Sequence, residues 1–215
     1  MNISRDEMHI YTVDGAVWPG VTTIINRVIR KPALERWIGE LGNREAGEVR
    51  DAAADHGTLV HALAALVVDG VSSIPMGDGE GPAQAQVDAF VEWYEDYVEE
   101  VYAVELVVAH PGYRYAGMLD YLLRMKGDTG PTVVDIKSGK SIYPEMRYQT
   151  AAYREAVLPL LSDYGFKGRR CRRGALHIPR DATGPARFCE HMRHGPDFQG
   201  FLSCLYLYGD LARGI

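Results

Sequence analysis

Hydrophobic positions recur at helical spacing in the first half of the chain, most clearly over residues 82–101. Seven apolar side chains from Val87 to Val101 are three or four residues apart, and six acids fill the positions between them. This spacing is typical of an amphipathic helix that buries one face. It predicts a helix over 82–101 with a solvated acidic face.

Three further helices are predicted in the same half of the chain. Thr22 or Thr23 can cap a short helix, and Pro32 suits the first turn of a second. A longer helical pattern covers residues 45–69 and ends at Gly70. Residues 1–21 lack such a pattern and predict irregular or short-strand structure.

The pattern changes to strands after the predicted acidic helix. Residues 102–109 and 113–125 are mainly apolar and are joined by the turn sequence His110-Pro111-Gly112. Residues 132–136 are also apolar and follow a second turn at 127–131. Short apolar runs separated by Gly and Pro predict three antiparallel strands in a meander.

The remaining pattern alternates helix and strand. Residues 144–158 predict a helix, 175–178 a further strand, and 197–211 a C-terminal amphipathic helix. The predicted fold class is α/β (α+β), with a central mixed, largely antiparallel sheet flanked by helices.

A chain of 215 residues predicts one domain, with residues 1–101 mainly helical and 102–180 holding the sheet. Hydrophobic residues make up 47% and charged residues 24%, which is ordinary for a globular protein. No apolar run is long enough to span a bilayer and no N-terminal h-region is present, so we expect a cytoplasmic protein without membrane contact. The three widely spaced cysteines match neither a disulfide framework nor a CxxC metal site.

Charge is distributed unevenly around a net value of -6. Residues 77–113 contain nine acids and no Lys or Arg, whereas residues 147–180 contain eight Lys or Arg and two acids. The basic segment is suited to phosphate groups and the acidic one would repel them. The candidate nucleic-acid contacts are Arg147, Arg154, Lys167, Arg169, Arg170, Arg172 and Arg173.

Two acids lie inside predicted strands, where Asp is rare. Asp120 interrupts one strand and Asp135 the next, and Lys137 shares a face with Asp135 because side chains alternate along a strand. Two carboxylates and an ammonium suit a Mg²⁺ site that acts on phosphate. The alternative is a surface ion pair on an edge strand, with Asp120 starting a turn, and these three residues alone favour neither interpretation.

Other polar residues have structural alternatives of their own. Glu105 lies within a predicted strand, as an edge residue or a third carboxylate of the same patch. A lone helical histidine such as His61 is more often a structural residue than a metal ligand. Gln149 and Tyr153 are four residues apart and share a helix face, where Tyr packing with an incidental Gln is the simpler interpretation.

Taken in order, these blocks make the chain resemble the PD-(D/E)XK nuclease superfamily, in particular its RecB-like branch. That branch includes phage recombination exonucleases and CRISPR-associated adaptation nucleases. Four blocks match in order and spacing. They are HGTLVH with His61, GMLDYLL with Asp120, VVDIKSGK with Asp135, Ile136 and Lys137, and YQTAAY with Gln149 and Tyr153.

The resemblance implies a restriction-endonuclease-like core and a role for each matched residue. Asp120 and Asp135 would be metal ligands, joined by the Ile136 carbonyl and by His61. Lys137 would orient or help activate the attacking water. Gln149 and Tyr153 would contact the scissile phosphate or support Lys137. Glu105 would take a supporting or outer-metal role.

The activity that the resemblance implies is that of a DNA nuclease dependent on Mg²⁺ or Mn²⁺, with one or two ions. An exonuclease in phage DNA recombination, replication or repair is favoured, acting in the bacterial host cell on DNA and alongside a single-strand annealing or recombination protein. A structure-specific endonuclease and a non-catalytic nucleic-acid-binding module are the alternatives.

Two departures from the family pattern are visible. His56 stands where an Arg is common, which would weaken a phosphate contact at neutral pH. Three cysteines are too few for the branch with an iron-sulfur cluster.

Overall fold

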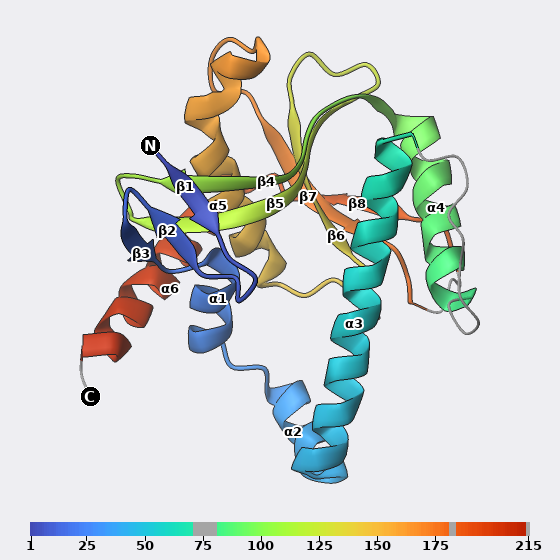
Figure 1. Cartoon of the computed structure of the whole chain (residues 1–215), viewed down its shortest axis with the longest axis vertical. Coiled ribbons are helices and arrows are strands. Elements are labelled where there is room, and N and C mark those ends of the chain that lie inside the picture. Colours follow the sequence, from blue (N-terminus) through green and yellow to red (C-terminus); the bar gives the residue numbers. More distant parts are fainter. Residues whose placement is uncertain (71–80, 181–183, 214–215) are drawn as a thin grey trace.

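The computed structural model describes residues 1–70, 81–180 and 184–213, and a five-stranded mixed sheet lies at its centre (Figure 1). The strand order is β4-β5-β6-β7-β8, with β6 and β7 parallel and the other neighbours antiparallel. The predicted fold class is therefore confirmed. The strands are Val98–His110 (β4), Tyr115–Met125 (β5), Thr132–Lys137 (β6), Arg172–His177 (β7) and Arg187–Glu190 (β8).

Three short strands at the N-terminus form a separate antiparallel sheet beside β4 and β5 (Figure 1). They are Ile3–Arg5 (β1), Tyr11–Val13 (β2) and Ala16–Trp18 (β3). Side chains of this sheet pack on the turn end of the β4–β5 hairpin in a small cluster of their own. Short strands in this segment were one of the two predicted outcomes.

The helices cover both faces of the central sheet. They are Val21–Val28 (α1), Pro32–Leu41 (α2), Asn43–Val68 (α3), Gly81–Tyr97 (α4), Met146–Val157 (α5) and His194–Arg213 (α6), with a 3₁₀ helix at Leu158–Tyr164 (η1). None of the helices in the described ranges is long and apolar enough to cross a membrane.

Some predicted boundaries were wrong. The acidic helix ends at Tyr97, and β4 begins at Val98, four residues before the predicted strand. The apolar spacing continues to Val101, but the backbone there pairs with β5, so strand pairing overrides the local periodicity. The cap of α1 is Gly20, which offers no side-chain hydrogen bond, so the predicted threonine caps lie inside the helix.

The predicted acidic face is exposed: all six acids from Asp88 to Glu100 are exposed, although Glu99 and Glu100 belong to β4 and only the other four to α4. Residues 77–80, which open the acidic segment, lie outside the described ranges. The sheet also extends past the predicted 102–180, because β8 pairs with β7 at residues 187–190.

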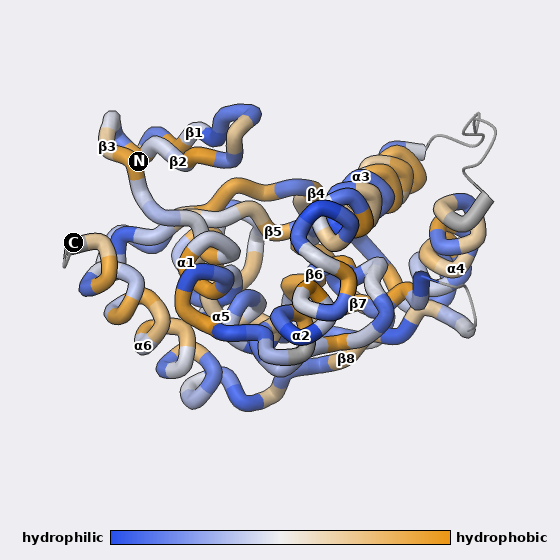
Figure 2. Tube along the Cα trace, turned by 90° about the horizontal axis from the view of Figure 1, so that it is seen from below, coloured by the Kyte–Doolittle hydropathy of each residue, from blue (hydrophilic) through white to orange (hydrophobic). Residues whose placement is uncertain are grey.

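Each face of the sheet carries its own apolar cluster. Val133 and Leu122 pack against α1, α5 and α6, whereas Val134 and Tyr121 pack against α3 and α4. Figure 2 shows these two groups of helices on opposite sides of β5 and β6. Because both faces are covered, β5 and β6 are almost continuously buried, and their sequences are mainly apolar. An acid within such a strand must therefore be buried too.

Arg173 is the largest fully buried side chain among the described residues. Its guanidinium donates to Asp197 Oδ2 at 2.6 Å, to Thr150 Oγ1 at 2.8 Å and to His194 Nδ1 at 3.1 Å, and so joins β7 to α5 and α6. It donates a further hydrogen bond to the Arg147 carbonyl at 2.8 Å. The predicted DNA contact at Arg173 is wrong, because this residue lies in a central strand beneath two helices.

Two more of the predicted DNA contacts are engaged inside the protein. Arg154 donates to the carbonyls of Cys171 and Arg169 and pairs with Glu155. Arg172 lies between the carboxylates of Asp128 and Glu190 and over the Phe188 ring. The charge of each is offset by the carboxylates it meets. The predicted contacts that remain at or near the surface are Arg147, Lys167, Arg169 and Arg170, of which Arg169 also pairs with Glu155 at 3.1 Å.

We predict that Arg173→Leu destabilises the fold by about 3–5 kcal/mol, since it leaves the Asp197 carboxylate buried without its partner. Urea unfolding followed by circular dichroism measures the change. The exposed Arg170→Leu is the matched control, expected to stay within about 0.5 kcal/mol of the wild type. Equal stability of the two variants would contradict a structural role for Arg173.

His191 adds a titratable group to the same network. Its Nδ1 lies 2.9 Å from Thr150 Oγ1, the oxygen that also accepts from Arg173. Burial, together with the positive charge of Arg173, lowers the pKa of His191 to about 4, although Asp197 opposes this. Protonation therefore favours the unfolded chain, and the stability that neutral His191 contributes is lost as pH falls from about 6.5 towards 4.

Between pH 7 and pH 4.5 we therefore expect the free energy of unfolding of the wild type to fall by about 2 kcal/mol more than that of His191→Asn. The free energy of unfolding in urea at the two pH values gives the comparison. Parallel losses in both proteins would show that another group controls the acid sensitivity.

Candidate active site

The two strand carboxylates lie where β5 and β6 stop pairing. The last paired residues are Tyr121 and Val134, although both strands continue beyond them. Past that point the Ile136 N–H donates to Asp120 Oδ2 at 2.6 Å. The Asp120 side chain thus takes the place of a backbone acceptor on β5, which explains how an acid is accommodated within a buried strand.

Asp135 and Lys137 face the same side of β6, as their spacing predicted. The Lys137 Nζ lies 2.5 Å from Asp135 Oδ2, and Asp135 is 2% exposed. Ile136 points to the opposite face and joins the apolar cluster beneath α3 and α4. A surface ion pair on an edge strand is therefore excluded, since β6 is a central strand and the pair is buried.

Two residues of α5 complete one side of the cluster. The Gln149 amide donates to Asp135 Oδ1 at 3.0 Å and to the Tyr153 hydroxyl oxygen at 3.1 Å. Both amide hydrogens are thereby engaged, so Gln149 orients Asp135 in this structure. Tyr153 is buried against Gly117, where an added Cβ would lie only 2.6 Å from the ring. Only glycine at this position lets the ring lie against β5.

His61 reaches the cluster from α3. Its Nδ1 lies 3.5 Å from Asp120 Oδ1. Burial alone would lower the pKa of His61, but the Asp120 carboxylate outweighs it and raises the pKa. Burial likewise favours a neutral Asp120, whereas His61, Lys137 and the Ile136 N–H together lower the pKa of that carboxyl. His61 and Asp120 thus stabilise each other's charged forms.

Asp135 is less well compensated. Burial is the main cause that raises its pKa to about 6; Lys137 opposes the rise and the neighbouring Asp120 adds to it. Burial also works against a charged Lys137, but Asp135 and Asp120 raise its pKa above the usual value. The ammonium is therefore retained at neutral pH, and the cluster still favours additional positive charge beside Asp135.

The geometry at Asp135 fits a divalent cation. Its Oδ2 is buried 2.5 Å from the Lys137 ammonium, and a carboxylate oxygen has a second lone pair that can bind a cation. The Ile136 carbonyl points to the same side of the strand as its N–H, towards Asp120. Asp120, Asp135 and this carbonyl offer the hard oxygen ligands that Mg²⁺ and Mn²⁺ prefer.

The protein groups do not form a closed metal cage. Within the described residues no three or more His, Cys, Asp or Glu side chains gather closely enough to hold an ion by themselves. Mg²⁺ usually takes one or two carboxylates and completes its coordination with water and substrate phosphate. Such an open site leaves room for a substrate.

Glu105 does not join the cluster. The pairs Val104–Tyr121 and Leu106–Leu119 place it directly opposite Asp120, but its backbone adopts φ 49° and its side chain is exposed. A positive φ in a non-glycine residue costs about 1–3 kcal/mol. The structure thus holds Glu105 beside the cluster in a strained conformation, with its carboxylate directed to solvent.

The basic segment before β7 lies at the other end of the sheet. Arg172 is paired with Thr132 at the start of β6, whereas Lys137 is paired with His177 at the end. These pairs are about 16 Å apart at roughly 3.3 Å per residue. Lys167, Arg169 and Arg170 precede Arg172 and so stand away from the carboxylates. Arg147, in the first turn of α5, is the predicted basic contact closest in sequence to Gln149.

Gln86 is a buried polar residue next to the cluster that the sequence analysis missed. It lies on the apolar face of α4, in line with Ala83 and Phe90, and is fully buried. Its amide oxygen lies 2.6 Å from His56 Nε2. His56 therefore faces another protein group, where the family pattern suggested a phosphate contact. A polar residue inside an apolar helical stripe was the available signal.

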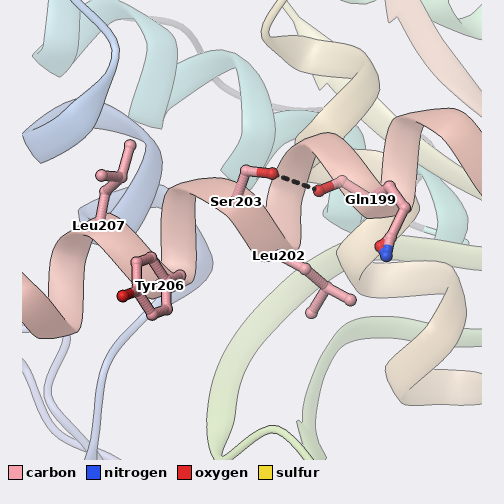
Figure 3. A pocket seen from close by; sticks show the side chains of 5 residues that line it. All are labelled: Gln199, Leu202, Ser203, Tyr206 and Leu207. Atoms are coloured by element: carbon pink, nitrogen blue, oxygen red, sulfur yellow. Dashed lines mark hydrogen bonds between the residues drawn. The ribbon is translucent and has the colours of Figure 1, made fainter.

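Two surface hollows lie elsewhere. One, of about 480 Å³, is on the outer side of α6 and is lined by Gln199, Leu202, Ser203, Tyr206 and Leu207 (Figure 3). It contains no charged side chain, and its serine is bonded to the Gln199 carbonyl at 3.0 Å. The other, of about 510 Å³, lies between α4 and β8 and includes Trp93 and Arg187. Neither contains a residue of the carboxylate cluster.

Comparison with known proteins adds no assignment to this geometry. No protein-family model and no curated protein was found to match the chain.

We predict that Mn²⁺ binds at the carboxylate cluster and that Asp135→Asn weakens this binding at least about tenfold, because the amide removes the charged ligand oxygen. Isothermal titration calorimetry with the metal alone measures the dissociation constant. Asp88→Asn, an exposed acid on α4, is the matched control and should bind like the wild type. Equal affinity in both variants would place the ion elsewhere.

Proposed function

We propose that this protein is a metal-dependent deoxyribonuclease whose active centre is the cluster of Asp120, Asp135 and Lys137. The observation that carries the proposal is the buried pair of carboxylates at the point where β5 and β6 separate, with the Lys137 ammonium 2.5 Å from one of them. The order of the four sequence blocks supports the same activity. Mg²⁺ or Mn²⁺ would be the cofactor and DNA the substrate.

The free energy that it costs to bury the cluster argues against a protein that only binds nucleic acid. Burying several charged groups costs free energy that is recovered only when they are well paired, and burial still raises the pKa of Asp135 to about 6 although Lys137 opposes the rise. A module that only holds nucleic acid needs a basic surface and gains nothing from buried acids. Incompletely compensated ionisable groups of this kind are typical of catalytic sites.

Each residue of the cluster would have a separate role in phosphodiester hydrolysis. Asp120, Asp135 and the Ile136 carbonyl would hold a divalent cation, whose positive charge would acidify water and offset charge on the phosphate. Lys137 keeps its proton because the two acids raise its pKa, so it serves as a hydrogen-bond donor to water and phosphate oxygens. Gln149 fixes the orientation of Asp135.

His61 acts on the other carboxylate. It holds Asp120 Oδ1 from α3 while the Ile136 N–H holds Oδ2, so both oxygens of Asp120 are fixed before substrate arrives. Such preorganisation avoids reorganisation during the reaction. In its neutral form His61 can itself ligate the cation, the role that the family resemblance gives it.

The exonuclease form of the activity rests on the likeness of the sequence blocks to those of phage end-resecting enzymes. We propose end-dependent degradation of DNA in recombination, replication or repair, in the cytoplasm of a bacterial host and alongside a single-strand annealing or recombination protein. A structure-specific endonuclease is the alternative. Arg147, Lys167, Arg169 and Arg170 would hold the DNA backbone by charge, in a manner that weakens with salt.

The test uses end-labelled linear DNA and covalently closed circular DNA, each with Mg²⁺, Mn²⁺ or a chelator. We expect the wild type to degrade linear DNA with either ion and to be inactive with chelator. Lys137→Met should cut about a thousandfold more slowly, because it loses a charge that stabilises the transition state. Its affinity for DNA in Ca²⁺ should change little, since the phosphate contacts remain.

Lys140→Met, three residues further on and exposed, is the matched control and should cut at the wild-type rate. Cleavage of the circular substrate would replace the exonuclease by the endonuclease. Binding of DNA without cleavage under any metal condition would favour the non-catalytic module.

A further inference from the structure

The buried side-chain amide of Gln86 makes three hydrogen bonds near the active centre, one more than that of Gln149. Its Nε2 donates to the Ile178 carbonyl at 2.6 Å and to the Ser138 carbonyl at 3.2 Å. Its Oε1 accepts from His56 Nε2 at 2.6 Å, which requires the imidazole proton to be on that nitrogen. One side chain of α4 therefore holds three other segments: α3, the residue after β6 and the residue after β7.

The two carbonyls mark the place where β6 and β7 end. Ile178 N–H donates to the Lys137 carbonyl at 3.0 Å, the last backbone hydrogen bond between these two segments in the described residues. Ser138 follows Lys137 directly, and both carbonyls beyond that bond turn to Gln86. On the other side of Lys137, Asp120 holds the Ile136 N–H. The backbone that carries the Lys137 ammonium is thus fixed both before and after that residue.

The bond to His56 fixes α3 in the same way. His56 lies five residues before His61 on one continuous helix. The helix also approaches the end of β6 closely, since an added Cβ on Gly57 would lie 3.5 Å from Ser138 Oγ. A shift of α3 along its axis would break the bond to Gln86 and move His61 away from Asp120 together.

Packing alone does not require an amide at this position. Ala83 and Phe90, the neighbours of Gln86 on the same helix face, are apolar and buried, so an apolar side chain of similar length would fill the space. An amide adds directional hydrogen bonds, which specify one arrangement of the segments that they join. Gln84 shows the contrast: its amide donates to Asp88, within the same helix and near the surface, and to no other group of the described residues.

We infer that Gln86 is a positioning residue, which through Ser138, Ile178 and His56 sets the places of Lys137 and His61 around the two carboxylates. The inference rests on the proposed nuclease function for its kinetic consequence. Its structural consequence is independent of that function, because the restrained segments exist whether or not the cluster cleaves DNA.

The experiment compares Gln86→Met with the matched control Gln84→Met. At saturating DNA and Mn²⁺, Gln86→Met should lower kcat by about 10- to 100-fold, since a displacement near 1 Å is enough for such a loss. Its KM, and its affinity for DNA in Ca²⁺, should stay within about twofold of wild type, because no phosphate contact is removed. Gln84→Met should match the wild type in all three.

Hydrogen exchange at the Ile178 amide supplies the second readout. That amide is protected by its bond to the Lys137 carbonyl, and we expect its exchange to be at least about tenfold faster in Gln86→Met than in Gln84→Met. Wild-type kcat together with wild-type protection in folded Gln86→Met would overturn the inference. A wild type that cuts no DNA would refute the nuclease function, and the exchange comparison would still decide the role of Gln86.

His56→Ala covers the case in which Gln86→Met does not fold. It removes one bond of the three from a half-buried position. A decrease in kcat of about 3- to 10-fold, the value of one hydrogen bond, is expected. An unchanged kcat in His56→Ala would overturn the inference.

Discussion

The organising constraint in this protein is the end of the β5–β6 ladder, where a carboxylate replaces a backbone acceptor. Asp120 accepts the Ile136 N–H and so allows the two strands to separate without leaving that donor unsatisfied. The separation in turn directs the Ile136 N–H, and with it the Ile136 carbonyl, towards the Asp120 side chain instead of a paired residue of β5. The whole cluster depends on this local feature, in which the Asp120 side chain replaces a backbone acceptor of β5.

Buried polar groups fix the surroundings of that point from several directions. Gln149 orients Asp135 from α5, and Gln86 holds the chain after Lys137 from α4. At the opposite end of the sheet Arg173 joins β7 to α5 and α6 through Asp197. Apolar packing on both faces supplies the driving force for folding, but it is not directional. The hydrogen-bonded side chains determine how the helices sit relative to the strands, and therefore how precisely the cluster is assembled.

The acidic and the basic segments of the chain differ in where the fold places their charges. The acids of α4 stay in solvent and form the solvated face that their spacing predicted. The densest basic segment behaves otherwise, because Arg172 and Arg173 belong to a central strand and Arg154 binds carbonyl groups and Glu155. Counting charges along a sequence cannot separate these cases, since a guanidinium is long enough to pair internally wherever the fold brings a carboxylate to it.

The sequence by itself determined most of the helices and strands, though not β8, and the same-face relation of Asp135 and Lys137, because helical spacing and strand alternation are local properties of the chain. It also identified Asp120, since an acid inside an apolar strand needs a specific partner. The partner itself, the burial of the ion pair, the outward turn of Glu105 and the internal roles of Gln86 and Arg173 were decided by the tertiary structure. Each depends on contacts between segments far apart in sequence, such as Gln86 with Ile178, and a local pattern holds no information on which distant groups will meet.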